Sequence, residues 1–175
     1  MFDVGAHVGF YTLLASAIVG SHGQVVAFEP LPENLHYVRE HLTMNQIDNV
    51  TIIGKAVADH TGFVNFRVHE NRAMGAIAGD GGMRVATICL DEFIQNSNFS
   101  PPSCIKMDVE GGEYRALIGA RNYLCDSHPV IFLSTHGPVV HSECCRFLKK
   151  CKYDLIPVDG RNLESSSSIL AVDGT

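Results

Sequence analysis

The chain has 175 residues, of which 46% are hydrophobic, and this length is enough for one domain with a substantial core. Its formal net charge of −6 argues against a nucleic-acid partner held by a broad basic face. No apolar stretch reaches the roughly 20 residues that a bilayer span needs. We therefore expect a single domain over residues 1–175, without a membrane span and with a cytoplasmic location as the default.

Six cysteines show neither a CxxC pair nor the spacing of a disulfide framework: Cys89, Cys104, Cys125, Cys144, Cys145 and Cys151. In a chain of this size such cysteines are typical of reduced, mostly buried small hydrophobic residues. The adjacent pair Cys144 and Cys145 also lacks the spacing of metal ligands. The sequence thus predicts free thiols and no metal site built on them.

The first part of the chain alternates strand-like and helix-like segments. A strand that leads to Asp3 is followed by a helix-like run and then by a short β-branched strand that ends at Glu29. Residues 32–46 have apolar side chains at helical spacing, behind a proline and a glutamate suited to a first turn. Residues 49–54 predict the third strand.

The middle of the chain breaks this rhythm. Residues 62–68 alternate apolar and polar side chains, which predicts a half-exposed strand in a hairpin. Residues 71–84, NRAMGAIAGDGGMR, are rich in glycine and predict a loop. Residues 85–96 predict a strand and a short helix.

The last part of the chain returns to alternation. A buried strand should end at Asp108, and the helix after it places Leu117, Ala120 and Leu124 on one face. A further strand, a helix and two final strands are expected at residues 129–137, around 144–151, at 153–158 and at 167–172. Alternation of this kind predicts a parallel sheet with helices on both faces. The two final strands lack a crossover helix, so they should pair antiparallel.

Polar side chains stand where the expected strands end, at Asp3, Glu29, Asp108 and, after the fifth strand, Ser134 and His136. In an open α/β sheet, ligands bind outside the carboxyl ends of the strands. Glu29 is placed to accept hydrogen bonds from both hydroxyls of a ribose, and a buried acid without such a partner would be costly. The sequence therefore predicts a ligand that contains ribose.

The turn between the first strand and the first helix has the pattern D-x-G-x-x-x-G, formed by Asp3, Gly5 and Gly9. Glycines there let the backbone approach a ligand, and the helix end offers unpaired N–H groups. The dinucleotide fingerprint G-x-G-x-x-G would put glycine where this chain has Asp3, and an acid there would repel a pyrophosphate. S-adenosylmethionine has no phosphate and carries an ammonium and a sulfonium, so the acidic turn favours this cofactor.

Five stretches in order, FDVGAHVGFYTLLAS, VVAFEPLPENLHYVREHL, AVADHTG, TICLDEF and IKMDVEGGEYRALIGA, resemble the FkbM family of S-adenosylmethionine-dependent methyltransferases. The resemblance runs from Phe2 to about Leu124. It implies an α/β, Rossmann-like class I methyltransferase with a mostly parallel seven-stranded sheet, an antiparallel last strand and helices on both faces. It also implies a hydroxyl acceptor on a small molecule, a sugar or a lipid-linked compound, and it leaves the oligomeric state open.

The resemblance carries cofactor-binding roles to Asp3, Gly5, Gly9, Glu29, Asp59 and Asp108. Asp3 would bind the ammonium of the cofactor, directly or through a water molecule, and Glu29 would hold the ribose. The turn that ends at Asp59 would lie beside the adenine. Asp108 would stand where the cofactor methyl group and the acceptor meet.

Methyl transfer to an alcohol needs a group that takes the proton as the oxygen attacks. Asp108 and His136 are the candidate bases, and hence the candidate catalytic residues. Glu110 and Glu113 are more typical of acids that stabilise a first helical turn. Mg²⁺ held by Asp108 and groups after the fifth strand is a weaker alternative, because no acid stands there, and no metal is expected.

Two departures from the family pattern bear on function. The chain has Ser134 to His136 where the family often has an acid, and it opens inside the first strand, as a truncated edge or as an unusually short member. A catalytically inactive or fragmentary cofactor-binding module is therefore the alternative to an enzyme.

Overall fold

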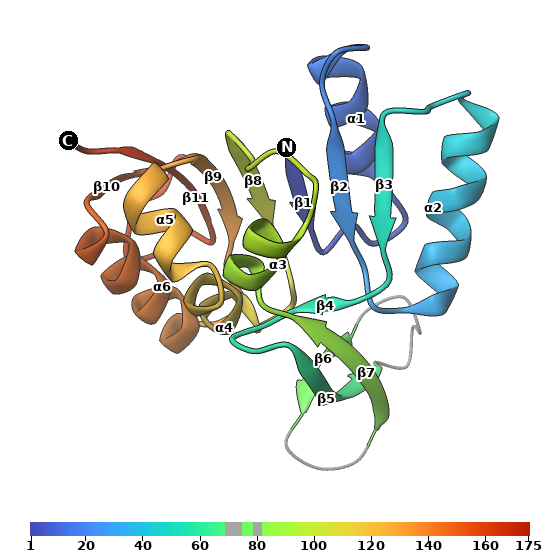
Figure 1. Ribbon diagram of the computed structural model, residues 1–175. Helices are drawn as coiled ribbons and strands as arrows, with labels where there is room; N and C mark the ends of the chain where they lie inside the picture. The colour runs from blue at the N-terminus through green and yellow to red at the C-terminus, as the bar shows by residue number, and fades with distance from the viewer. Residues whose placement is uncertain (69–74, 79–81) are drawn as a thin grey trace.

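The computed structural model describes residues 1–68, 75–78 and 82–175, and a seven-stranded sheet forms its centre in the order β10-β11-β9-β8-β1-β2-β3 (Figure 1). The strands are β1 (Phe2–Val4), β2 (Val25–Phe28), β3 (Val50–Ile53), β8 (Cys104–Met107), β9 (Val130–Ser134), β10 (Tyr153–Pro157) and β11 (Ser168–Asp173). The pairs among β3, β2, β1, β8 and β9 are parallel, whereas β11 is antiparallel to both β9 and β10. The predicted α/β fold with an antiparallel last strand is confirmed.

Helices cover both faces of this sheet, with α1 behind it and α3, α4 and α5 in front of it in Figure 1. Their bounds are α1 (Phe10–Val19), α2 (Pro32–Met44), α3 (Leu90–Asn96), α4 (Glu113–Ile118), α5 (Arg121–Ser127) and α6 (Pro138–Lys150). Both α2 and α6 begin with a proline, which suits the first helical position because its missing N–H has no partner there. In the part of the chain that the structure describes, no helix is long and apolar enough to cross a membrane.

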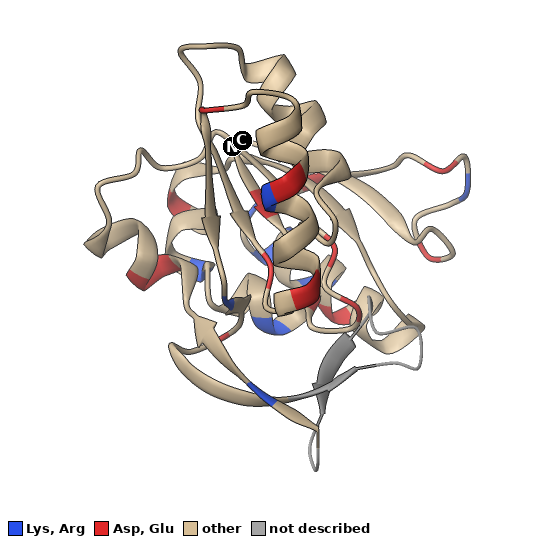
Figure 2. Cartoon of the chain, turned by 90° about the vertical axis from the view of Figure 1, so that its right-hand side faces the viewer, with Lys and Arg blue, Asp and Glu red and all other residues tan. Residues whose placement is uncertain are grey.

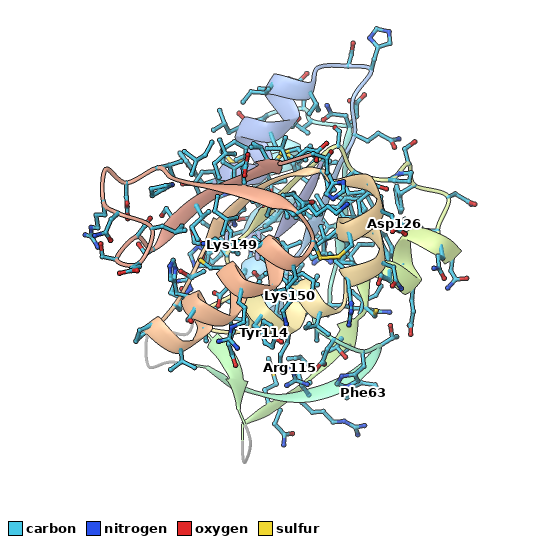
Figure 3. The ribbon with its side chains drawn as sticks, turned by 90° about the vertical axis from the view of Figure 1, so that its left-hand side faces the viewer. Phe63, Tyr114, Arg115, Asp126, Lys149 and Lys150 are labelled. Carbon is cyan, nitrogen blue, oxygen red and sulfur yellow. A yellow bond between two sulfur atoms is a disulfide. The ribbon has the colours of Figure 1, made fainter. Side chains whose placement is uncertain are left out.

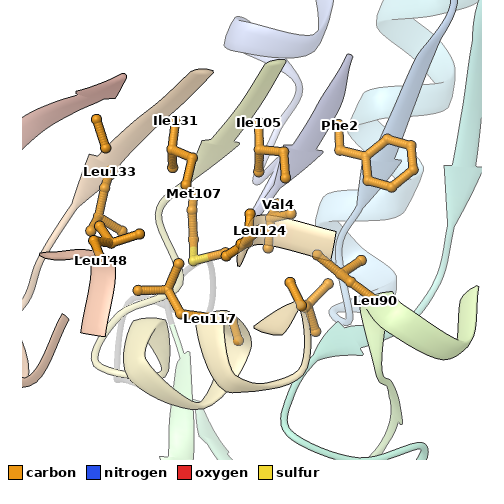
Figure 4. Close-up of a cluster of buried hydrophobic side chains, with 14 of the residues drawn as sticks. Phe2, Val4, Leu90, Ile105, Met107, Leu117, Leu124, Ile131, Leu133 and Leu148 are labelled. Carbon is orange, nitrogen blue, oxygen red and sulfur yellow. The ribbon is translucent and has the colours of Figure 1, made fainter. Parts of the chain in front are cut away.

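The main core lies between the sheet and the helices in front of it (Figure 4). Leu117 and Ala120, which the sequence places on one helical face with Leu124, are fully buried with it against the strands. Ile105 of β8 and Ile131 of β9 contribute to the same cluster. Burial of side chains of this size stabilises a fold by about 1.5–3 kcal/mol each. The helices are therefore packed firmly on the sheet, and this packing keeps the strand ends in place.

A second, four-stranded sheet lies below the first in Figure 1, in the order β4-β7-β5-β6. Its strands are β4 (Ala56–Val57), β5 (Gly62–Val68), β6 (Gly75–Ala78) and β7 (Met83–Ile88). The predicted hairpin strand at 62–68 is confirmed, since β5 pairs antiparallel with both β6 and β7.

The prediction of a loop over residues 71–84 is wrong for part of that range. Residues 75–78 form β6, and Met83 begins β7. Backbone pairing with β5 makes β6 a strand although its Gly-Ala-Ile-Ala sequence carries a weak strand signal. Residues 71–74 and 79–81 lie outside the described residues.

The prediction that all six cysteines are reduced is also wrong, because Cys125 and Cys151 form a disulfide (yellow bond in Figure 3). Cys125 belongs to α5 and Cys151 follows α6. The ends of these helices meet, as the hydrogen bond from the His128 ring Nε2 to the carbonyl oxygen of Cys151 shows at 2.8 Å. Sequence spacing does not reveal this meeting, since it depends on how the two helices pack on the sheet.

Charged side chains are mixed over the surface. Figure 2 shows the basic positions, in blue, spread over several elements rather than gathered on one face. This distribution agrees with the absence of a broad basic face expected from the net charge, for the residues that the structure describes.

The disulfide predicts a thiol count. Alkylation of the unreduced, denatured protein should label four cysteines, Cys89, Cys104, Cys144 and Cys145, and reduction should raise the number to six. Intact-mass spectrometry measures both values, and peptide mapping identifies the labelled positions. Six labelled cysteines before reduction would show that the disulfide does not form.

Candidate cofactor and acceptor site

A cavity of about 260 Å³ opens at the carboxyl ends of the central strands. Four segments line it: the turn after β1 with the start of α1, the end of β2 with the start of α2, strand β4, and the end of β8 with the turn after it. Open α/β sheets bind ligands at this edge because the helix N-termini and the strand ends converge there. This cavity lies at the sheet edge where the sequence predicts the ligand site.

The turn after β1 comes very close to the turn after β8. Gly5 has a φ of +80°, and a Cβ atom there would collide with the carbonyl oxygen of Asp108. The amides of Gly5 and Ala6 both donate to the carbonyl oxygen of Phe28 at 3.0 Å, which fixes the turn to β2. Only glycine combines this φ with this approach, so Gly5 shapes the cavity wall.

Gly9 has a different role from Gly5. It has a φ of +94° and precedes α1, and a Cβ atom there would meet the side chain of Val38 on α2 at 3.4 Å. Gly5 lines the cavity and Gly9 does not. The structure therefore places Gly9 at a helix–helix contact beside the predicted binding turn.

Asp3 lies beneath the turn and is fully buried. Its Oδ2 accepts a hydrogen bond from Thr12 at 2.6 Å, and its Oδ1 is 3.1 Å from the ammonium Nζ of Lys106 on β8. Lys106 also donates to the carbonyl oxygen of Gly5 at 2.7 Å and lines the cavity, whereas Asp3 does not. Because Asp3 is fully buried and does not line the cavity, direct contact between Asp3 and a ligand ammonium would require the turn above it or Lys106 to move.

The sequence analysis missed Lys106. The available signal was a lysine inside the apolar run CIKM, because a charged residue in a buried strand needs a partner of opposite charge. In the β1–β8 register Lys106 stands directly beside Asp3. The positive charge of Lys106 balances the negative charge of Asp3, so this pair adds no net charge beside the cavity.

Glu29 is the acid that faces the cavity at the end of β2. Its carboxylate accepts hydrogen bonds from the backbone N–H of His7 and of Leu31, both at 2.9 Å, and from the Asn34 amide at 3.2 Å. Burial raises the pKa of Glu29, and these three hydrogen bonds oppose the rise. A carboxylate has about four acceptor positions, so capacity for a further donor remains.

The expectation that Glu29 would need a ligand hydroxyl to offset its burial is therefore wrong. His7, Leu31 and Asn34 already supply donors from the protein. They hold the carboxylate in a fixed orientation at the cavity wall, which prepares it for a ligand without requiring one.

Asp59 lies away from the cavity. Its carboxylate accepts two hydrogen bonds from Arg115 of α4, at 2.9 and 3.1 Å, and the His60 ring lies at 2.7 Å. The Arg115 hydrogen bonds lower the pKa of Asp59, with burial acting weakly against them. Asp59 lies in the turn between β4 and β5, so this pair joins α4 to the small sheet, while Ala56 and Val57 line the cavity instead.

Three acids surround His136, which follows β9. We call Asp108, Glu110, Glu113 and His136 the acid–histidine cluster. The ring Nδ1 lies 2.7 Å from Glu113 Oε1, and Nε2 lies 3.7 Å from Asp108 Oδ1 and 3.5 Å from Glu110 Oε2. Burial alone would lower the pKa of His136, but the Glu113 hydrogen bond and the three negative charges raise it above its ordinary value.

Glu113 lies in the first turn of α4, as the sequence favours, and it also contacts His136. Its side chain is 0% exposed, and its Oε1 accepts from the Gly111 N–H at 3.0 Å as well as from His136. Sequence alone could not reveal this contact, because the turn after β9 brings His136 onto the N-terminal end of α4. The two candidate catalytic residues, Asp108 and His136, do lie together, and Asp108 lines the cavity.

Comparison with known proteins identifies the family of the chain. A family model described as the methyltransferase FkbM domain matches residues 3–155. The chain belongs to the FkbM methyltransferase family. Membership of this methyltransferase family confirms the predicted cofactor, S-adenosylmethionine rather than a dinucleotide.

Individual FkbM relatives agree with this assignment. The hexuronic acid methyltransferase AglP of Haloferax volcanii is 25% identical over 154 residues, which cover 87% of this chain and 62% of AglP. The crystal structure of the FkbM methyltransferase from Methylobacillus flagellatus KT has a TM-score of 0.67 at 21% identity and covers 98% of this chain and 42% of its own. The chain thus spans less than two thirds of either relative.

A more distant structure has the same fold. Fibrillarin from Aeropyrum pernix, solved with natively bound S-adenosylmethionine, has a TM-score of 0.58 at 10% identity and covers 98% of this chain and 64% of its own. At this identity the likeness shows the fold alone. It extends across nearly all of this FkbM chain.

The packing of Gly5 gives a prediction about the FkbM site. Gly5→Ala should abolish detectable binding of S-adenosylhomocysteine in calorimetry, because the new Cβ pushes the turn away from Asp108. Gly160→Ala is the matched control: Gly160 has a φ of +76° but nothing within 4 Å of its Cβ position. The control should lose only about 1–2 kcal/mol of stability to backbone strain. Equal effects of the two substitutions on binding would show that the close approach is unimportant.

Proposed function

We propose that this chain transfers a methyl group from S-adenosylmethionine to a hydroxyl oxygen of a sugar, of a lipid-linked compound or of another small molecule. The observation that carries this proposal is the acid–histidine cluster at the edge of the cavity, where Asp108 lines the wall and His136 lies behind it. AglP, named for methylation of a hexuronic acid, supports a sugar hydroxyl among these acceptors. A cytoplasmic location stays a prediction.

The cavity wall offers a group for each part of the cofactor. Glu29 has acceptor capacity for the ribose hydroxyls, and the apolar Val57 with Leu31 suits the adenine. The turn at Gly5 and the ammonium of Lys106 suit the methionine end, since the lysine can pair with the methionine carboxylate. In this arrangement the sulfonium points toward the turn after β8.

The reaction itself asks little covalent chemistry of the protein. The acceptor oxygen attacks the methyl carbon, the carbon–sulfur bond breaks, and S-adenosylhomocysteine leaves. The protein must align the two partners and receive the hydroxyl proton. We propose Asp108 and His136 as the side chains that receive the proton of the acceptor hydroxyl.

The role of Glu29 predicts a loss of cofactor affinity. Glu29→Ala should weaken binding of S-adenosylhomocysteine by about 2 kcal/mol, or roughly 30-fold, through lost charge-assisted hydrogen bonds. Isothermal calorimetry measures this, with the exposed Glu33→Ala in α2 as the control that should bind normally. Glu29 also accepts hydrogen bonds from His7 and Asn34, so its loss can affect folding. The variant Glu29→Gln should therefore be measured as well, and thermal unfolding should verify that each variant is folded. Unchanged affinity in folded variants would refute the ribose role.

The role of Asp108 predicts a loss of turnover. Asp108→Asn should slow transfer of labelled methyl groups to hydroxyl-bearing sugars and sugar acids by about 100-fold, and its affinity for S-adenosylhomocysteine should change less than about threefold. A fully active variant would remove Asp108 from the mechanism. Cofactor binding by the unsubstituted chain without transfer to any hydroxyl would instead favour a binding module.

A further inference from the structure

The ring of His136 is held by a hydrogen bond to α4. The backbone beside it is anchored, because the N–H of Thr135 donates to the carbonyl oxygen of Ser167 at 2.8 Å. The ring itself reaches Glu113, whose Oε1 lies 2.7 Å from Nδ1. In the part of the chain that the structure describes, the ring makes no other hydrogen bond. Glu113 therefore sets the direction in which the imidazole points.

This hydrogen bond also decides which ring nitrogen is free. A carboxylate can only accept, so in the neutral ring Nδ1 carries the hydrogen and Nε2 keeps its lone pair. Nε2 lies 3.7 Å from Asp108 Oδ1 and 3.5 Å from Glu110 Oε2, which is too far for a good hydrogen bond. Both of these acids line the cavity. The free nitrogen thus lies at the edge of the cavity, beside two of its lining residues.

From this geometry we propose that Nε2 of His136 takes the proton of the acceptor hydroxyl and that Glu113 positions the ring for this step. The inference rests on the proposed function and adds to it the atom that receives the proton and the residue that holds it. The hydroxyl gives its proton to Nε2 as its oxygen attacks the methyl carbon, and the carbon–sulfur bond breaks. The imidazolium then releases the proton to water. Glu113 does not line the cavity, so it acts through His136.

The spacing leaves room for a hydroxyl at Nε2. Hydrogen-bonded oxygen and nitrogen atoms lie about 2.9 Å apart. An oxygen at that distance from Nε2 can lie equally close to Asp108 Oδ1, because these two atoms are 3.7 Å apart. The side chains of His136 and Asp108 are 37% and 34% exposed, so an acceptor can approach both. The hydroxyl can therefore donate to Nε2 from a position beside the cavity wall.

The burial of Glu113 is costly for the fold, and its effect on His136 explains why a carboxylate stands there. Its side chain is fully buried, yet its Oε2 has no hydrogen-bond partner among the described residues. Packing alone at the start of α4 would be served by an apolar side chain. Once the ring takes a proton, the negative charge of Glu113 stabilises the imidazolium, together with the charges of Glu110 and Asp108.

Gly111 makes two substitutions of Glu113 informative. Its N–H donates to Oε1 of Glu113 at 3.0 Å, and this is the same oxygen that faces Nδ1 of His136. A glutamine must turn its carbonyl oxygen toward both donors, so Glu113→Gln keeps the Nδ1–H form of the ring but removes the negative charge. Glu113→Met has a similar length and removes the acceptor itself. The first variant should keep the ring in place, and the second should release it.

The test is a double-mutant cycle on the full chain, read out as transfer of labelled methyl groups to hydroxyl-bearing sugars and sugar acids. Glu113→Met should lower kcat about 100-fold and Glu113→Gln about tenfold, while the acceptor KM changes less than about threefold. Affinity for S-adenosylhomocysteine should stay unchanged in both. In the His136→Asn background, Glu113→Met should have no further effect, because the two residues act as a unit. Glu92→Gln, an exposed first-turn acid of α3, is the control that should keep full activity.

Nuclear magnetic resonance of the ring nitrogens tests the positioning without any acceptor. At high pH, where the ring is neutral, His136 of the unsubstituted chain should be in the Nδ1–H form, and its signals are identified by their loss in His136→Asn. Glu113→Gln should keep this form, whereas Glu113→Met should shift the ring toward the Nε2–H form. Thermal unfolding verifies that each variant is folded.

The outcomes separate the role of Glu113 from the proposed function. A folded Glu113→Met variant with unchanged kcat, or with the same loss in the presence and absence of His136, would overturn the positioning role, although methyl transfer would still support the function. An Nδ1–H form that persists in Glu113→Met would overturn this role as well. Transfer to no hydroxyl by the unsubstituted chain, with the ring spectra as expected, would count against the function and support Glu113 as the residue that orients the ring.

Discussion

The architecture of the site depends on the close approach of two backbones, at Gly5 after β1 and at Asp108 after β8. Val4 and Met107 are paired in the parallel register of these strands, so both turns leave the sheet at the same level. Because a Cβ atom at Gly5 would collide with the Asp108 carbonyl oxygen, the two turns fit together only through glycine. The turn at Gly5 and the turn that carries Asp108 and Glu110 consequently line one cavity, although a hundred residues separate them in the chain.

Beneath these turns, Asp3 and Lys106 form a buried charged pair across adjacent strands. Such a pair contributes little net stability, since each ion loses its hydration, but each partner makes the burial of the other tolerable. This pair changes the physical account of the acidic turn. Asp3 acts through the position of Lys106 and of the Gly5 carbonyl oxygen, and the carboxylates that line the cavity are those of Glu29, Asp108 and Glu110.

Sequence patterns predicted the features that depend on local periodicity and on strand ends. The mostly parallel sheet, the helix with Leu117 and Leu124, and the convergence of Asp108 with His136 follow from alternation along the chain and from the rule that ligands bind where strands end, whereas the count of seven strands came from the resemblance to the FkbM family. Features set by packing between distant segments were not predictable in this way. Three such features arise where two elements meet in space. They are the disulfide between Cys125 of α5 and Cys151 after α6, the burial of Glu113 against His136, and the ion pair of Asp59 with Arg115. Strand β6 was missed because its partner β5, rather than its own composition, makes it a strand.

The position of β11 in the sheet has a consequence for how the domain is made. β11 lies between β9 and β10, although it follows both in the chain, and it supplies the backbone partners of each. During synthesis β10 therefore emerges from the ribosome before the neighbour that anchors it exists. The left edge of the sheet cannot close until residues 168–173 have been translated, so this edge assembles after the strands that precede it.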